Sequence, residues 1–276
     1  MVLESLLSAE SAQRNPWAIT ILAFVFVSLG ILATTVLNLE KADFILVLFV
    51  ALPSIPFLLR LFNFEEEEAE HKRVLGSRTL ARYFPSILVM MFYFLGLIIG
   101  FTFWYAILPQ NVTSQLFSLQ EKELQSIQAS FQGYATKLFE EGSTVFETIF
   151  LHNLEVLVLI LVFSILYGAG AVFILAWNAS VISVFLVNFA RFFVLHENTA
   201  SFATGLGFGL LGILPHGIFE LLSYTTGALA GGILSSAIIR GCYNRPEFAQ
   251  IIYDTAKLIG WAIIFLAIGA FIEGGF

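Results

Sequence analysis

The order of apolar and polar residues predicts a series of membrane-spanning helices. Long uncharged stretches alternate with short polar segments, and each stretch is close to the roughly 20 apolar residues that a helix needs to cross a bilayer. The predicted spans are Trp17–Leu37, Phe44–Phe62, Tyr83–Leu108, Glu147–Tyr167, Ala171–Ala190, Gly217–Ile239 and Ile251–Ile272. We therefore predict an all-α, polytopic transmembrane helical bundle of about seven spans.

One apolar segment does not fit this regular order. Ser201–Leu214 has only 14 residues, which is too short to cross the bilayer at 1.5 Å per residue. The string Pro215-His216-Gly217 follows it, and proline removes a backbone hydrogen bond that lipid cannot replace. We predict a re-entrant half-helix that enters from outside and breaks at Pro215 and Gly217, after which Gly217–Ile239 completes the crossing.

The segment Gln110–Gly142 has the pattern of an amphipathic helix. Its apolar residues recur every three or four positions and so form one stripe. They are Phe117, Leu124, Ile127, Phe131, Tyr134 and Leu138. The opposite face has little basic charge, so attraction to anionic lipid does not explain it. Two explanations remain open: the stripe contacts another protein or a second copy of this chain, or it covers the ends of the chain's own spans.

The composition agrees with a membrane protein and excludes several functions. Hydrophobic residues make up 58% of the chain and charged residues 12%, whereas soluble domains carry about 25% charged residues. The net charge of −7 argues against nucleic acid as a partner, and the single cysteine, Cys242, excludes an internal disulfide. The chain lacks the motifs His-Glu-x-x-His and Gly-x-Ser-x-Gly and a phosphate-binding loop. We expect no cofactor and no enzymatic activity.

The basic residues predict the orientation of the chain. If the N-terminus is cytoplasmic, nine of the 13 Lys and Arg residues lie on the inner side, as the positive-inside rule requires. The C-terminus is then extracytoplasmic, and so is Gln110–Gly142. The strongly charged segment Asn63–Arg82 lies in the cytoplasm, where we expect a solvated helix.

Several polar residues fall inside predicted spans. His216 and Glu220 are four residues apart and share one helix face. We predict that they form one cluster, in the outer half of the membrane, with polar residues of the fourth and fifth spans. These are His152, Asn153, Glu155 and Asn178. An ionisable group inside a membrane costs a few kcal/mol, so a role is expected for it.

Two roles for this cluster remain open at this stage. Histidine titrates near neutral pH, so a His–carboxylate cluster can pass protons, and its oxygen and imidazole groups can bind a cation. Alternatively, the groups satisfy one another and the broken backbone, and thereby lock the helices together. The sequence does not decide whether the cluster binds a metal ion.

The string Leu214-Pro215-His216-Gly217-Ile218-Phe219-Glu220 resembles the corresponding stretch of the stage II sporulation protein M family. The similarity extends to the span around His152, the turn Gly168-Ala169-Gly170 and the span with the central Asn178, and it covers roughly Tyr83 to Phe276. The resemblance divides the chain into two predicted parts. Residues 1–82 hold two added N-terminal helices and a charged cytoplasmic loop, and residues 83–276 form the family-like transmembrane domain with the extracytoplasmic helix 110–142.

In sporulating bacteria the family resemblance implies a membrane anchor in a complex that remodels the cell wall during engulfment. Members with the His–Glu form of the motif also occur in organisms that do not sporulate, where the resemblance implies membrane location and fold. We expect an integral membrane scaffold for membrane or cell-envelope remodelling, with the lipid bilayer, envelope proteins or copies of itself as partners. The alternatives are a small-ion or lipid transporter or channel that uses the break at Pro215–Glu220, and an intramembrane enzyme.

Overall fold

A computed structural model describes residues 8–71, 79–127, 145–196, 201–246 and 248–274, and every regular element in these ranges is helical. The elements are α2 (Ala9–Arg14), α3 (Trp17–Leu37), α4 (Ala42–His71), α5 (Thr79–Ile107), α6 (Gln110–Leu116), α8 (Val145–Tyr167), α9 (Ala171–His196), α10 (Phe202–Ile239), the 3₁₀-helix η1 (Cys242–Asn244) and α11 (Phe248–Glu273). A further helical segment covers 118–127. Among the described residues, seven helices are long and apolar enough to cross a membrane. The prediction of an all-α, multi-pass membrane bundle is confirmed.

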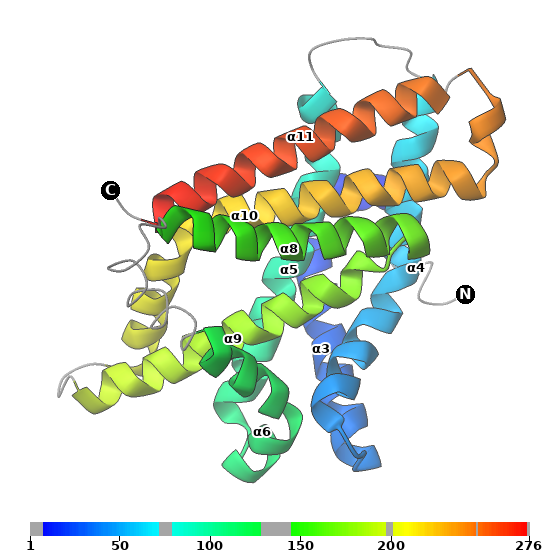
Figure 1. The fold of residues 1–276 in the computed structure, drawn as a ribbon. Helices are drawn as coiled ribbons and strands as arrows, with labels where there is room; N and C mark the ends of the chain where they lie inside the picture. The colour runs from blue at the N-terminus through cyan, green and yellow to red at the C-terminus, as the bar shows by residue number, and fades with distance from the viewer. Residues whose placement is uncertain (1–7, 72–78, 128–144, 197–200, 247, 275–276) are drawn as a thin grey trace.

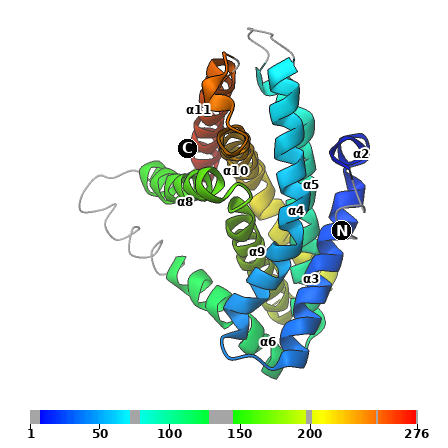
Figure 2. The same cartoon turned by 90° about the vertical axis from the view of Figure 1, so that its right-hand side faces the viewer.

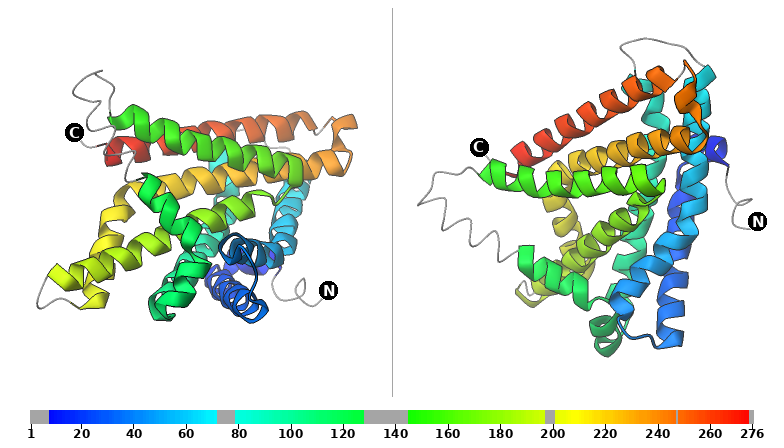
Figure 3. Two further views of the ribbon diagram at one scale, coloured as in Figure 1. Left: turned by 60° about the horizontal axis from the view of Figure 1, so that its bottom comes forward. Right: turned by 45° about the vertical axis from the view of Figure 1, so that its right-hand side comes forward.

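The long helices form two groups that α9 connects. In Figure 1, α8, the C-terminal part of α10 and α11 lie side by side in one layer, and all three contact one another. Helices α3, α4 and α5 pack together and cross the direction of that layer, as Figure 2 and both views of Figure 3 show. Helix α9 contacts α4 and α5 as well as α8 and α10. Buried side chains from both groups join in one hydrophobic core.

Helix α10 differs from the sequence-based expectation. It is one helix of 38 residues, and its helical backbone continues through Pro215, His216 and Gly217. Figure 1 shows a change of direction between its yellow N-terminal part and its golden C-terminal part. The predicted break is therefore corrected to a bend, because a helix can relieve the clash of a proline ring by bending while its other hydrogen bonds remain. The re-entrant path of residues 201–214 stays a prediction.

The start of α10 and the turn before α9 follow from local sequence. The Oγ atom of Ser201 accepts a hydrogen bond from the backbone N–H of Thr204 at 3.1 Å, as an N-cap residue does. Gly168, between α8 and α9, has a φ of 65°, which glycine adopts without strain. The glycine turn predicted at Gly168–Gly170 is therefore confirmed.

The charged segment after α4 also differs from expectation. Helix α4 continues to His71, and the side chains of Glu65 and Glu66 are only 4% and 0% exposed. The prediction of a solvated helix is therefore wrong for these two residues, because other helices pack over them. The basic residues Lys72, Arg73 and Arg78 lie outside the described residues.

Over its described residues, the amphipathic segment is two helices and not the single helix that was predicted. Helix α6 ends at Leu116, and a second helical segment begins after Phe117. Phe117 is fully buried against the rings of Phe101 and Tyr105, with centroid distances of 6.2 and 4.9 Å. Leu124 also packs against the chain's own core. These two residues cover the chain's own spans, which was the second of the two explanations.

The structure describes only one of the other four residues of the predicted stripe, Ile127. Ile127 is half-exposed. Phe131, Tyr134 and Leu138 lie outside the described residues, so contact between this part of the stripe and another protein stays a prediction.

Candidate functional site

Glu220 lies just after the bend of α10 and connects this helix to α8. The Nδ2 atom of Asn153, on α8, donates a hydrogen bond to Glu220 Oε1 at 2.5 Å. The hydroxyl group of Tyr224 donates to Asn153 Oδ1 at 2.9 Å. Asn153 is 9% exposed and Tyr224 is 5% exposed. The nitrogen and the oxygen of the Asn153 amide therefore each have a hydrogen-bond partner inside the protein. This arrangement holds α8 against α10.

Helix α11 completes the cluster from the other side. A Cβ atom on Gly269 would lie 3.2 Å from Glu220 Cγ and 3.3 Å from the carbonyl oxygen of His216, so the two helices approach closely here. Glu273 follows Gly269 by about one turn on the same face, and its carboxyl group neighbours that of Glu220. The Glu220 cluster is therefore Asn153, Glu220, Tyr224 and Glu273.

The structure brings together only part of the predicted set. Asn153 and Glu220 are joined, and His216 lies half-buried one turn before Glu220. His152 and Glu155 are exposed on α8. The Nδ2 atom of Asn178 donates to the carbonyl oxygen of Ile174 in its own helix at 2.8 Å.

Sequence reasoning missed two members of the cluster. Tyr224 follows Glu220 by four residues and therefore shares its face, so a search for polar neighbours at helical spacing would have found it. Glu273 was missed because the last predicted span ended at Ile272, one residue earlier. Among the described residues, no group of three or more His, Cys, Asp or Glu side chains is arranged to hold a metal ion.

The substitution Asn153→Ala is expected to lower the free energy of unfolding by about 1–3 kcal/mol, because it leaves a buried hydroxyl group and a half-buried carboxyl group without their shared partner. Thermal unfolding in detergent measures this, with a thiol-reactive fluorogenic dye that reports exposure of Cys242, which is 1% exposed in the fold. The matched control is Asn178→Ala, which removes a bond within one helix and should stay within about 0.5 kcal/mol of wild type. Equal effects of both substitutions would contradict the assigned role of Asn153.

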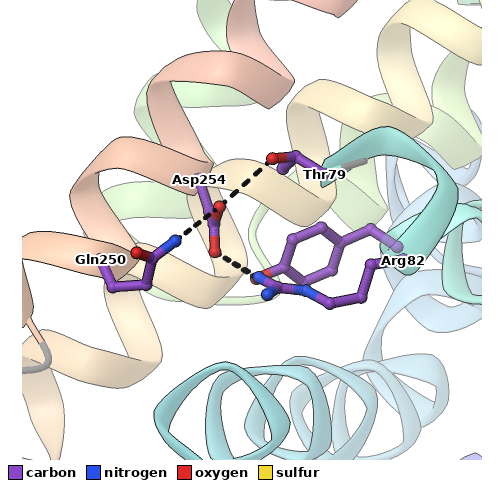
Figure 4. Close-up of polar contacts among 5 residues, drawn as sticks. Thr79, Arg82, Gln250 and Asp254 are labelled. Atoms are coloured by element: carbon purple, nitrogen blue, oxygen red, sulfur yellow. Dashed lines mark hydrogen bonds and ion pairs between the residues drawn. The ribbon is translucent and has the colours of Figure 1, made fainter. Parts of the chain in front are cut away.

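A second polar cluster joins the start of α11 to the start of α5 (Figure 4). The carboxylate of Asp254 is 2% exposed and accepts four hydrogen bonds. Oδ1 accepts from Thr79 at 3.4 Å and from Gln250 at 3.0 Å. Oδ2 accepts from Arg82, as part of an ion pair, and from Tyr83 at 3.3 Å. A carboxylate has about four acceptor positions, so Asp254 has none left for a ligand.

The end of α4 provides two further buried carboxylates. Glu66 accepts from Arg240 at 2.6 Å and from the thiol of Cys242 at 3.2 Å, which connects α4 to the end of α10. Glu65 accepts from Ser86 on α5 at 2.5 Å and from Gln13 on α2 at 2.8 Å. These bonds join α4 to α2, α5 and the end of α10, and both carboxylates already accept hydrogen bonds from protein donors. The less saturated Glu220 cluster is therefore the better candidate for a functional site.

Comparison with known proteins gives one match. The family model described as stage II sporulation protein M matches residues 86–276. No curated protein and no solved structure matches the chain. The matched region begins inside α5 and includes the Glu220 cluster and Asp254.

Proposed function

Because the chain belongs to the stage II sporulation protein M family, we propose that it is an integral membrane scaffold without catalytic activity of its own. It acts in membrane or cell-envelope remodelling by associating with other membrane and envelope proteins or with copies of itself. The family match supports this role, since it includes all of α8–α11. The seven candidate spans supply the membrane anchor that such a scaffold needs.

The observation that carries the proposal is that buried polar side chains form bonds between helices. Asn153 connects α8 to Glu220, Arg82 connects α5 to Asp254, and Arg240 connects α10 to Glu66. Polar bonds between helices add to the packing that holds membrane proteins together. Such bonds favour a fixed arrangement of helices, which suits a protein that positions partners.

A second candidate function is a small-ion or lipid transporter. It is favoured by the bend of α10 next to the paired carboxyl groups of Glu220 and Glu273. Transporters commonly place their ion sites at interrupted or bent helices inside the membrane. In that function Glu220 would carry a proton or a cation, whereas in a scaffold it holds α8, α10 and α11 together.

The substitution Glu220→Gln separates the two functions. A glutamine side chain has the same shape, accepts the hydrogen bond from Asn153 and can donate one to Glu273, so helix packing is retained. We expect this variant to restore envelope shape and growth in a deletion strain as well as wild type does. We also expect purified wild-type protein in liposomes to move ions or lipids no faster than protein-free liposomes do.

The transporter predicts the opposite pair of results. Wild-type liposomes would show flux, and Glu220→Gln would lose both flux and complementation at an unchanged protein level. Glu10→Gln is the matched control, because Glu10 lies in an exposed pair with Arg14 and should behave as wild type in every assay.

A further inference from the structure

Within the part of the chain that the structure describes, helix α8 has one buried face and one exposed face. Its buried residues recur every three or four positions along the side that packs on α10. They are Ile149, Asn153, Leu157, Ile160 and Ser164. Close contacts on this side include Leu157 beside Gly227 and Ser164 beside Gly231. The opposite side exposes the large apolar residues Leu151, Val158, Leu159, Val162, Phe163 and Leu166. We call these residues, together with His152 and Glu155, the outer face of α8.

Two ionisable residues interrupt this apolar surface, and both are exposed. At 3.6 residues per turn, Glu155 lies roughly 200° around the helix from Asn153, at the centre of the outer face. His152 lies about 60° from Glu155 and one turn before it. Neither side chain points toward the chain's own bundle.

The depth of Glu155 makes exposure to lipid costly. The candidate span Phe146–Tyr167 has 22 residues and is therefore about 33 Å long, close to the thickness of the hydrocarbon core. Glu155 lies near its middle. A carboxylate at the centre of a bilayer costs about 2.5–3.5 kcal/mol on insertion scales, and such groups almost always face protein or water. The outer face of α8 therefore needs a protein cover that carries a complementary polar group.

We propose that this cover is the outer face of α8 in a second copy of the chain, with His152 of each copy paired with Glu155 of the other. A two-fold axis along the membrane normal places equivalent residues of the two copies at the same depth. His152 and Glu155 then differ in height by about 4.5 Å, which side chains of this length can bridge. An isologous contact forms the His–Glu pair twice, so no carboxylate is left alone in the interface.

The surrounding apolar residues complete this contact. Val158 and Val162 lie on the same side as Glu155 and are 48% and 43% exposed. The dimer extends the proposed scaffold function, and its role in the cell rests on that function. Its existence is tested without any assay of envelope remodelling.

Cysteine cross-linking in native membranes tests the contact directly. The variants Val158→Cys and Val162→Cys should each form a disulfide-linked dimer under mild oxidation. Ile21→Cys on α3 is the matched control, because Ile21 is 66% exposed and lies outside the proposed contact. Cys242 can stay in place, since it is 1% exposed. Failure of both α8 variants to form a dimer, or a link only to a protein of different mass, overturns the proposal.

Charge exchange between two tagged copies tests the pairing itself. A copy with His152→Glu carries two acids on the outer face of α8, and a copy with Glu155→His carries two bases. Each copy alone should self-associate about five- to tenfold more weakly than wild type, whereas a mixture should form heterodimers that co-purify. Wild-type self-association of the single variants, or no recovery in the mixture, contradicts the His–Glu pair.

A folding control and a conservative variant accompany these experiments. Dye labelling of Cys242 shows whether each variant is folded, and Glu155→Gln serves as a conservative second variant that should also weaken the dimer. A cross-linked dimer of Val158→Cys, in cells whose envelope and growth do not change when the gene is deleted, would support the contact and contradict the scaffold role. Full complementation by a variant with no dimer in any assay would support the scaffold role and contradict the contact as its basis.

Discussion

Replacing Asp254 with alanine is expected to lower the free energy of unfolding by about 3–5 kcal/mol. The substitution removes a carboxylate that is 2% exposed and accepts hydrogen bonds from Thr79, Arg82, Tyr83 and Gln250. The guanidinium group of Arg82 then remains largely enclosed, with a side-chain exposure of 20%, and has lost its ion-pair partner. Removing one partner of a buried pair costs far more than the pair itself contributes.

Thermal unfolding reported by Cys242 measures this effect without a further substitution, since this is the only cysteine of the chain. Glu10→Ala is the control, because it also breaks a carboxylate–arginine pair, but one with side-chain exposures of 64% and 78%. Exposed pairs contribute about 0–1 kcal/mol, so the control should unfold close to wild type. A loss for Asp254→Ala that is no larger than the loss for the control would refute the structural role of this cluster.

The second large effect is expected from Gly96→Ala in α5. A Cβ atom there would lie 2.4 Å from the carbonyl oxygen of Thr20 and 2.8 Å from Ala23 Cβ, both on α3. A backbone oxygen cannot move away by a change of rotamer, so the two helices must separate. Overpacking of this kind typically costs about 1–3 kcal/mol. The same dye-based unfolding experiment measures the loss.

Gly207→Ala provides a control with the opposite expected sign. A Cβ atom at Gly207 in α10 meets no other atom within 4 Å. Alanine has a higher helix propensity than glycine, so this substitution should raise stability by up to about 1 kcal/mol. The packing of α3 on α5 is not as described if both alanine variants are stabilised.

The spans could be predicted because they depend on local sequence alone. A run of apolar residues must be covered by lipid or protein wherever it lies, so the bounds of α3 coincide with the predicted span Trp17–Leu37. The turn at Gly168 was predicted for the same reason, since short glycine segments end helices. The bend of α10 was predicted as a break, because the sequence shows the proline but not the helices that support the backbone around it.

The polar contacts could be predicted only in part, because they depend on the arrangement of distant helices. Arg82 and Asp254 are 172 residues apart in the chain, and nothing near either residue marks the other as its partner. Charge runs usually indicate solvent exposure, and that rule failed for Glu66, which Arg240 covers from α10. Asn153 and Glu220 were predicted as neighbours because both are strongly polar residues inside apolar spans, where partners are required.

The attachment of α11 at both ends has a mechanical consequence. Asp254 ties its beginning to α5, and Glu273 ties its end to Glu220, about 28 Å away along the helix axis. Because α11 is attached at two distant points, it cannot easily slide along its axis or rotate about it. It therefore fixes the position of the C-terminal part of α10. The N-terminal part of α10 lies beyond these attachment points and rests on α9 through Gly205 and Gly209. We therefore expect that any hinge motion within α10 occurs at Pro215, between these two parts of the helix.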